Sequence, residues 1–538
     1  MPVSQVRLAH PGDAGRIVEL VFSAFGGDYP TKEVYDASWM ALQLETASGQ
    51  ETWVAEVDGL INASVTFLKP AQPPNPVLNL GRNLFRPESY SDGTAKALLQ
   101  AINEMAMERG QIVVARVPAH DNKQQILFEN LNYSCVGFQP FKHMLPNRTS
   151  TLFYVREANQ VLLSRLPLSE SLPQISELAA MTFNRLKISN PMTVRDGAVG
   201  YPIQTDLRVN EASYEDYKLW RDHCQSANPP VEISAGYNLG LGMFRIEAPM
   251  SFQTVLGQVE SQIVAGIAYY FDEHDRCVRI VDGFSTDDVS MGTLLQQVTR
   301  IAQDQFSAVY VEVDALATAP RFLKTTEQLG FIPVTYLPAF SSQHGDHADV
   351  VKMVKLNMPY ALENLDLTAH ARSVVEIIDR NFQDQKIGVA IINLLRTLPI
   401  FEGLGDGELR KIARLFSQKL FRAGEQIFKK GDSGESAYVV MRGQVDIQLE
   451  ENTKPIATVQ AGKVFGELAF LDGAPRNAHA IAVQPSIVLL IHRNAFNELV
   501  QREPHLGMVI MRNIAIDLSN KLRLSNTTIA SLRQAVKS

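Results

Sequence analysis

The chain lacks several features that would mark a secreted or membrane protein. Its 538 residues include three cysteines, Cys135, Cys224 and Cys277, which are too few and too scattered for a disulfide framework or a cysteine metal site. No apolar run approaches the length of a membrane span, and the first residues have no signal-peptide core. These absences predict a protein of the reducing cytoplasm, with no membrane partner and no bound metal.

Positive charge is also in short supply. Lys and Arg number 50 against 58 Asp and Glu, which gives a formal net charge of −8 and argues against bulk binding of nucleic acid. The composition, 45% hydrophobic and 20% charged, is ordinary for a globular protein. This length leaves room for about three domains. The sequence does not fix the oligomeric state, and a homo-oligomer is compatible with it.

One stretch near the C-terminus, "FGELAFLDGAPRNAHAIA" (465–482), carries two isolated charges in a small, apolar run. Gly466 permits close backbone approach, and a short helix is predicted over 468–471, whose free N-terminal amides attract anions. The guanidinium of Arg476 suits a phosphate, and the carboxylate of Glu467 accepts hydrogen bonds from hydroxyls. The residues therefore indicate a sugar-phosphate site. A buried ion pair between Glu467 and Arg476 is the alternative that they leave open.

The flanking sequence predicts the fold around this stretch. Residues 421–448 read as alternating strands broken by four glycines, as in a small antiparallel barrel. A strand and a helix follow at 486–500, and a last helix at 508–526. Over about 386–525 this pattern resembles the cyclic nucleotide-binding domain of the regulatory subunits of protein kinase A and of the catabolite activator protein.

That resemblance implies roles for the isolated charges. Glu467 would hold the ribose 2′-hydroxyl and Arg476 the cyclic phosphate, helped by the backbone amides of Leu468, Ala469 and Ala478. In the family, a threonine after the arginine favours cGMP and a small residue usually accompanies cAMP. Asn477 is neither, so cAMP is favoured and cGMP stays open. The catabolite activator protein carries a helix-turn-helix domain after its last helix. The residues after 526 are too few for one, so we expect the output to lie upstream.

The upstream segment 4–155 reads as a strand, a helix, a hairpin, a strand, a long helix and further β and α elements. It resembles the GNAT superfamily of acyl-CoA N-acyltransferases at "PESYSDGTAKALL" (87–99) and "LFENLNY" (127–133). The resemblance implies that acetyl-CoA lies against the loop before the long helix, with Tyr90 replacing the family's Arg or Gln. The loop residues are Ser91, Asp92, Gly93, Thr94 and Ala95. Helix N-capping is the competing role for Asp92.

The segment 160–356 repeats this plan, ending in the family's Leu-Gly-Phe at 329–331. Gly292 is retained in its loop, whereas Val289 and Leu294 depart from the pattern, and Leu294 could obstruct a cofactor. The predicted fold is therefore α+β, with two tandem GNAT-like mixed-sheet domains followed by a β-barrel (jelly-roll) cyclic nucleotide-binding domain with flanking helices. The predicted boundaries are 1–155, 156–357 for the more degenerate copy, a helical linker at 358–395, and 396–538.

Catalytic residues are less well marked. The tyrosine that often serves as acid in this superfamily aligns with Phe128 and Thr326, and the fourth strand has no glutamate. His120, at the end of the fifth strand, is a candidate general base; a solvated histidine bonded to Asp121 is the alternative. Asp314 occupies a similar place in the second copy.

The sequence as a whole predicts a cyclic-nucleotide-regulated N-acetyltransferase. The resemblance implies acetyl-CoA as donor and an amine, most readily a protein lysine, as acceptor. The alternative is a non-catalytic cyclic nucleotide sensor whose degenerate GNAT pair is a scaffold or an acyl-CoA-sensing module. Residues 363–401, which read as two amphipathic helices, would transmit nucleotide binding to the upstream half.

Overall fold

The computed structural model describes residues 5–29, 31–45, 49–68, 77–145, 147–156, 161–162, 164–190, 192–194, 198–203, 207–225, 232–233, 252–343, 346–451 and 453–535. The chain forms two compact units, Met1–Phe382 and Gln383–Ser538, each of which is considered by itself.

The first unit is built on one mixed sheet of 14 strands. Its N-terminal half contains β1 (Gln5–Leu8), β2 (Gln50–Val57), β3 (Leu60–Leu68), β4 (Val77–Phe85), β5 (Ile112–Pro118), β6 (Ser134–Met144) and β7 (Arg148–Arg156). Its C-terminal half contains β10 (Arg208–Ala212), β11 (Gln253–Val259), β12 (Gln262–Asp272), β13 (Cys277–Ser285), β14 (Tyr310–Leu316), β15 (Ile332–Gln343) and β16 (Asp346–Leu356). A separate two-stranded sheet pairs β8 (Glu170–Ser171) with β9 (Thr193–Val194).

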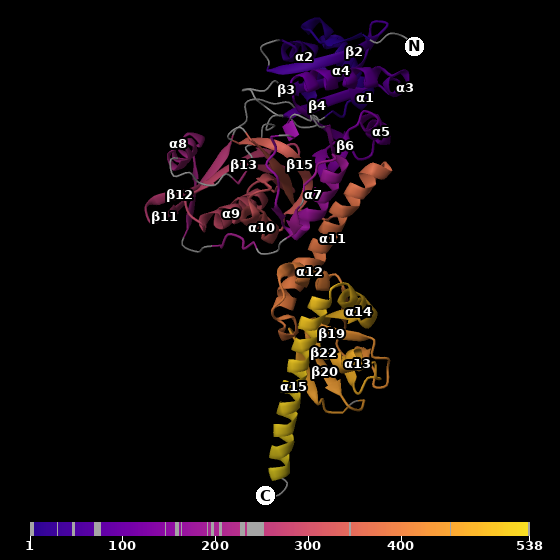
Figure 1. Ribbon diagram of the computed structural model, residues 1–538, viewed down its shortest axis with the longest axis vertical. Helices are drawn as coiled ribbons and strands as arrows, with labels where there is room; N and C mark the ends of the chain where they lie inside the picture. Colours follow the sequence, from indigo (N-terminus) through magenta and orange to yellow (C-terminus); the bar gives the residue numbers. More distant parts are fainter. Residues whose placement is uncertain are drawn as a thin grey trace. The chain divides into compact units, whose positions relative to one another are not determined.

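The two halves of the large sheet repeat one strand order. The order is β1-β2-β3-β4-β5-β7-β6 in the first half, and reading inwards from the other edge it is β10-β11-β12-β13-β14-β16-β15. The halves join where β6 pairs with β15 through Gly137 and Thr335. In Figure 1 the N-terminal strands β2–β4 and the later strands β11–β13 lie in different parts of this sheet. The sequence predicted two similar copies but not their fusion into a single sheet.

Each half has one parallel strand pair, and in both halves the pair separates. In the first half β4 pairs with β5 from Val77–Ile112 to Leu80–Ala115, although both strands continue beyond. In the second half β13 pairs with β14 over the corresponding four positions and then also separates. Beyond these points the two strands of each pair are no longer in register with each other.

Helices cover both faces of the sheet. They are α1 (Ala14–Phe25), α2 (Ala37–Gln43), α3 (Ser89–Asp92), α4 (Thr94–Glu108), α5 (Asn122–Glu129), α7 (Pro173–Arg185), α8 (Tyr214–Gln225), α9 (Ser290–Asp304) and α10 (Pro320–Gln328), with 3-10 turns η1 (Pro11–Asp13) and η2 (Lys32–Tyr35). The adjacent β2 residues Val54 and Ala55 belong to different apolar clusters, one shared with α1 and the other with α4. Because neighbouring strand residues point to opposite faces, these two helices lie on opposite sides of the sheet.

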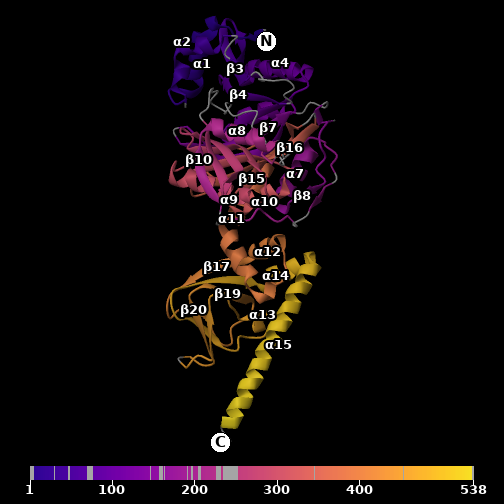
Figure 2. The same cartoon turned by 90° about the vertical axis from the view of Figure 1, so that its left-hand side faces the viewer.

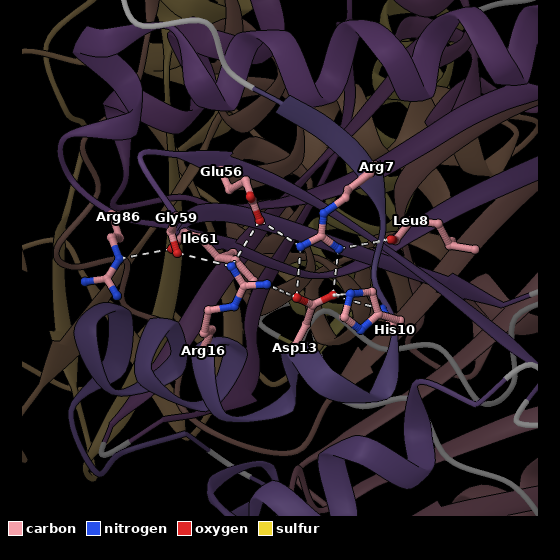
Figure 3. A network of polar contacts seen from close by, with 9 residues as sticks. All are labelled: Arg7, Leu8, His10, Asp13, Arg16, Glu56, Gly59, Ile61 and Arg86. Atoms are coloured by element: carbon pink, nitrogen blue, oxygen red, sulfur yellow. Dashed lines mark hydrogen bonds and ion pairs between the residues drawn. The ribbon is translucent and has the colours of Figure 1, made fainter.

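A network of ion pairs ties the edge strand β1 to α1 (Figure 3). Asp13 is fully buried and pairs with Arg7 at 2.7 Å and with Arg16, and Glu56 pairs with both arginines. Asp13 also accepts a hydrogen bond from the backbone N of His10 at 2.9 Å. Asp13 stands directly before α1, but its side chain makes no capping hydrogen bond to that helix and instead holds the two arginines.

The connector between the units differs from its prediction. In place of two helices the structure has one, α11 (Ala369–Arg396), which begins in the first unit and ends in the second. No helix in the described parts of the chain is long and apolar enough to cross a membrane.

The second unit is a roll of two four-stranded sheets with helices around it. The sheets are β17-β24-β19-β22 and β18-β23-β20-β21, with bounds β17 (Phe416–Phe421), β18 (Gln426–Phe428), β19 (Ser436–Arg442), β20 (Gln444–Gln448), β21 (Ala457–Gln460), β22 (Val464–Phe465), β23 (His479–Ala482) and β24 (Ser486–His492). Its helices are η4 (Pro399–Phe401), α12 (Asp406–Ala413), α13 (Glu467–Asp472), α14 (Arg493–Arg502) and α15 (Pro504–Ala535). Figure 2 shows α15 running past the strands as one long helix. The whole fold is thus mixed α+β, with a large sheet followed by a jelly-roll-like unit, as predicted at this level.

Candidate functional site

The short helix α13 begins at Gly466, a position that favours glycine. Gly466 has φ of +73°, and a Cβ there would lie 2.8 Å from Nη1 of Arg476. The first bond back to this residue runs from Phe470 N to Gly466 O at 3.4 Å. The preceding amides of the first turn therefore have no partner within the helix. This is the helix that the sequence placed at 468–471.

Arg476 is buried beside that helix start, with 4% of its surface exposed. Nη1 donates to Gly466 O at 2.7 Å, and Nη2 donates to Ser436 O at 2.5 Å. The guanidinium carbon lies 4.4 Å from the centroid of the Phe428 ring and 5.4 Å from that of Tyr438. Burial lowers the pKa of Arg476 below its ordinary value. The predicted alternative, an ion pair with Glu467, is not what holds this arginine, because its anchors are two backbone carbonyls and two ring faces.

One donor of Arg476 is left over. Its Nε is buried and has no hydrogen-bond partner among the described residues. A buried, unpaired donor of a charged group is costly unless something else satisfies it. An anion next to the amides at the start of α13 would do so.

A second arginine supports the far end of α13. Arg493 Nη2 donates to Gly434 O at 3.0 Å and to Ala469 O at 3.3 Å. Gly473, which ends the helix with φ of +75°, would place a Cβ 2.6 Å from Nη1 of Arg493. The two glycines thus each face an arginine, one at the start of the helix and one at its end.

The other residues named from the sequence surround this helix start. Glu467 and Ala478 are half-buried, Ala469 is buried, and Leu468 and Asn477 are exposed. An apolar hollow of about 50 Å³ lies between α13, β19 and the helices α14 and α15, and Glu467 and Phe470 are among its lining residues. The end of α13 that carries Glu467 therefore also borders the space next to α15.

In the first unit, the loop residues predicted for acetyl-CoA lie between α3 and α4. Gly93 has φ of +85°, and no described heavy atom lies within 4 Å of the position of a Cβ there. Asp92 Oδ1 accepts a hydrogen bond from Thr94 N at 2.7 Å at the start of α4, although the N-cap position of that helix is Gly93. Ser91 lies in the short helix α3, and Ala95 is buried in the first turn of α4.

The matching loop of the second half is covered by the chain itself. A Cβ on Gly292 would lie 2.5 Å from the carbonyl oxygen of Pro202 and 2.8 Å from that of Tyr201. Leu294 is fully buried in the core of the first unit. Beyond the parallel pairing of β13 and β14, Ile233 forms a bridge to Ala315 on β14.

The two candidate catalytic residues lie in different settings. His120 is exposed in the turn after β5. Its neighbour Asp121 caps α5 by accepting from Gln124 N at 3.0 Å, and it also accepts from Tyr90 Oη at 3.4 Å. Asp314 on β14 is held by Lys352, whose Nζ lies 2.5 Å away. An ion-paired carboxylate is a poor general base, so His120 is the better placed of the two.

Sequence reasoning missed the residues that position Arg476 and a group of buried charges in the first unit. The carbonyl of Ser436 and the rings of Phe428 and Tyr438 carry no sequence signal for this role. The buried Arg116 and Glu312 do carry one, because each is a charge inside an otherwise apolar strand. The described residues contain no group of His, Cys, Asp or Glu that could hold a metal ion.

Comparison with known proteins agrees with the geometry of the second unit. Residues 418–503 match the family model of the cyclic nucleotide-binding domain. The chain is 31% identical over 128 residues to the cyclic AMP receptor protein of Thermus thermophilus, covering 23% of this chain and 57% of that protein. It is 31% identical over 149 residues to the cGMP-dependent protein kinase egl-4 of Caenorhabditis elegans, covering 26% of this chain and 18% of the kinase. It is 32% identical over 124 residues to the cAMP-dependent protein kinase regulatory subunit of Emericella nidulans, covering 23% of this chain and 29% of that subunit.

The chain thus spans less than two thirds of the length of each of these relatives. Within the second unit, residues 418–503 form a cyclic nucleotide-binding domain. That family match does not extend to the first unit.

Proposed function

We propose that this protein is an N-acetyltransferase whose first unit transfers acetyl from acetyl-CoA to an amine under the control of cyclic nucleotide bound to the second unit. The observation that supports the proposal is that both halves of the first unit repeat one strand order around a parallel pair that separates, which is the order expected from the resemblance to acyl-CoA N-acyltransferases. In the superfamily that the sequence resembles, the thioester lies where those strands part. A protein lysine is the acceptor that the resemblance favours.

The proposed nucleotide is cAMP, with its phosphate between Arg476 and the start of α13. The unpaired Nε of Arg476 and the amides of Leu468 and Ala469 supply donors for the phosphate, and Glu467 supplies an acceptor for the ribose hydroxyl. Two of the compared relatives are named for cAMP and one for cGMP. The exposed Asn477 could both donate and accept, so cGMP is the competitor to test.

The first half is the proposed site of acetyl-CoA. Open space next to Gly93 leaves room for a pyrophosphate at the start of α4, as far as the described residues extend. In the second half Pro202 lies over the corresponding glycine, and Ile233 pairs with the separated strand. His120 would act as general base, because a lysine with an ordinary pKa near 10.4 must lose a proton before it attacks.

Coupling between the units is proposed to run through α11. Gln125 of α5 makes two hydrogen bonds to the backbone just before α11. Its Nε2 donates to Asp366 O at 2.9 Å, and its Oε1 accepts from Thr368 N at 3.0 Å. Asp366 N in turn donates to Ala119 O at 3.0 Å, next to His120. These hydrogen bonds connect the start of α11 to the end of β5, so a movement of α11 could shift the residues around His120.

The test is release of coenzyme A from acetyl-CoA by the full chain, with a lysine-rich protein pool as acceptor, with and without cAMP. We expect cAMP to change the rate by roughly 5- to 150-fold, the range of a coupling of about 1–3 kcal/mol. Gly93→Glu should abolish acetyl-CoA binding, while Gly93→Ala, which carries the same backbone strain without bulk or charge, should retain most of it. Both variants should bind cAMP normally.

The competing function is a non-catalytic sensor, favoured by the absence of the superfamily's tyrosine at Phe128 and Thr326. Acetyl-CoA binding without turnover at any cAMP concentration would establish that function in place of the enzyme. Loss of cAMP binding in Arg476→Ala, by roughly ten- to hundredfold, tests the nucleotide site separately.

A further inference from the structure

The large sheet curves so strongly that strands far apart in its order face each other. Four strands, β7, β6, β15 and β16, separate β5 from β14. Even so, burial and the nearby guanidinium of Arg279, on β13, lower the pKa of Arg116, on β5, to about 10. Gln139 of β6 also reaches β14, with its Nε2 2.8 Å from Glu312 Oε2 and 3.2 Å from Tyr310 Oη. The polar faces of the two parallel pairs therefore meet between the halves.

Every other cation named at this junction has a carboxylate partner. Arg279 Nε lies 2.5 Å from Glu312 Oε1, and Lys142 Nζ lies 3.0 Å from Glu312 Oε2. Lys352 Nζ lies 2.5 Å from Asp314 Oδ1. These pairs satisfy the rule that buried charge is paired.

Arg116, on the side of the first half, breaks that rule. It is 8% exposed, and its contacts are Asn79 Oδ1, 3.0 Å from Nη1, and the ring of Phe153, whose centroid is 5.1 Å from Cζ. No carboxylate pairs with it among the described residues. A buried cation without a partner lowers the stability of a protein, and sites that break such a rule are commonly functional.

The side-chain amide of Asn79 indicates which kind of ligand would complete this site. Because the oxygen of Asn79 faces Arg116, its Nδ2 is left buried and without a hydrogen-bond partner in the described part of the chain. The unsatisfied buried atom here, Asn79 Nδ2, is a donor, and the Arg116 guanidinium beside it is a cation, so a ligand must supply an acceptor and negative charge. Glu312 and Asp314 lie close enough to influence Arg116, and they would repel a dianion more than a monoanion. A planar carboxylate fits the fork of an arginine best.

We propose that Arg116 and Asn79 bind the carboxylate of a small molecule at the junction between the two halves of the first unit. Nothing in the cyclic nucleotide-binding unit takes part. Arg116 directly follows Ala115, the last residue of β5 that pairs with β4, so the site lies next to the proposed thioester position. Carboxylate binding is still tested without acyl transfer, because the experiment measures melting alone.

The experiment is calorimetric melting of the full chain, in which the second unit serves as an internal reference. Sodium acetate is the probe, acetamide is its uncharged isostere, sodium phosphate is the dianionic comparison, and NaCl equalises ionic strength. The variants are Arg116→Met and Asn79→Leu, with Arg279→Met as the matched control from a paired cation. At about 100 mM, acetate should raise the melting temperature of the wild-type first unit by about 1–3 °C.

We expect acetate to have no effect on Arg116→Met and a reduced effect on Asn79→Leu, and acetamide to have none on any protein. Without probe, Arg116→Met should melt at or above the wild type, because an unpaired buried charge has gone, whereas Arg279→Met should melt lower because Glu312 loses a partner. The proposal is overturned if Arg116→Met melts as low as Arg279→Met. It is equally overturned if acetate acts alike on wild type and Arg116→Met, or if phosphate stabilises the protein and acetate does not.

Discussion

The two glycines that bound α13 allow the phosphate site to be separated from the general integrity of the helix. Gly466 and Gly473 both have positive φ, and each would place a Cβ within 3 Å of an arginine Nη1. Gly466→Ala and Gly473→Ala should therefore cost similar amounts of stability, about 1–2 kcal/mol of left-handed backbone strain plus the contact. Gly466→Ala would displace Arg476, whereas Gly473→Ala would displace Arg493.

Only the first substitution should affect the ligand. The Cβ of Gly466→Ala would lie 2.8 Å from Nη1 of Arg476 and 3.2 Å from the ring of Tyr438, so the guanidinium must move. Losing a charge-assisted hydrogen bond costs about 1.5–3 kcal/mol, which weakens binding roughly 10- to 150-fold. Gly473→Ala displaces Arg493, which bonds the far end of the helix, and should change affinity by less than about threefold.

The assay is isothermal titration of the full chain with cAMP, alongside thermal unfolding of each variant. Equal losses of stability with unequal losses of affinity are the expected result. If Gly473→Ala weakens cAMP as much as Gly466→Ala does, affinity follows the folding of α13 as a whole. The assignment of the phosphate to Arg476 would then fail.

Two further outcomes follow from contacts in the first unit. Burial would raise the pKa of Asp13, but hydrogen bonds from Arg7 and from the His10 backbone outweigh it and hold that pKa well below its usual range. Asp13→Asn should therefore lose on the order of 3 kcal/mol at pH 7 in urea unfolding. The difference from wild type should shrink as pH falls below about 4 and through the lowered folded pKa, so a difference that does not depend on pH would contradict the pairing. Gln125→Leu removes both bonds to the segment before α11 and should make cAMP affinity insensitive to acetyl-CoA. Titrations with and without acetyl-CoA check this, and an unchanged coupling would exclude this route.

Local patterns in the sequence predicted the second unit well. Glycines at 424, 431 and 443 all have positive φ, as turn positions between strands require, and the predicted helix after Gly466 is α13. The charges in that stretch were visible because they interrupt an apolar run. Their partners were not, because a carbonyl such as that of Ser436 looks the same in every sequence.

Long-range relations in the first unit could not be predicted in this way. The tandem plan was visible, but the joining of β6 to β15 depends on residues almost 200 positions apart in the chain. The connector was misjudged because polar residues around 379–386 interrupt its apolar stripe, although the helix continues through them. Arg116 is visible as a charge in the strand "QIVVARVPAH", although no sequence-based expectation rested on it, and only the fold shows that it has no carboxylate partner among the described residues.

The join between the two halves also limits how this protein can be divided or have evolved. At the pairing of Gly137 with Thr335, a Cβ on Gly137 would lie 2.2 Å from Thr335 Oγ1, so this glycine lets the two sheets become one. A fragment ending near residue 156 would expose the edge of β6, and an exposed edge strand can pair with other chains and aggregate. It would also strip Gln139 and Lys142 of their partners on β14. The two halves therefore share one sheet and its buried contacts, and we expect removal of either half to destabilise the other.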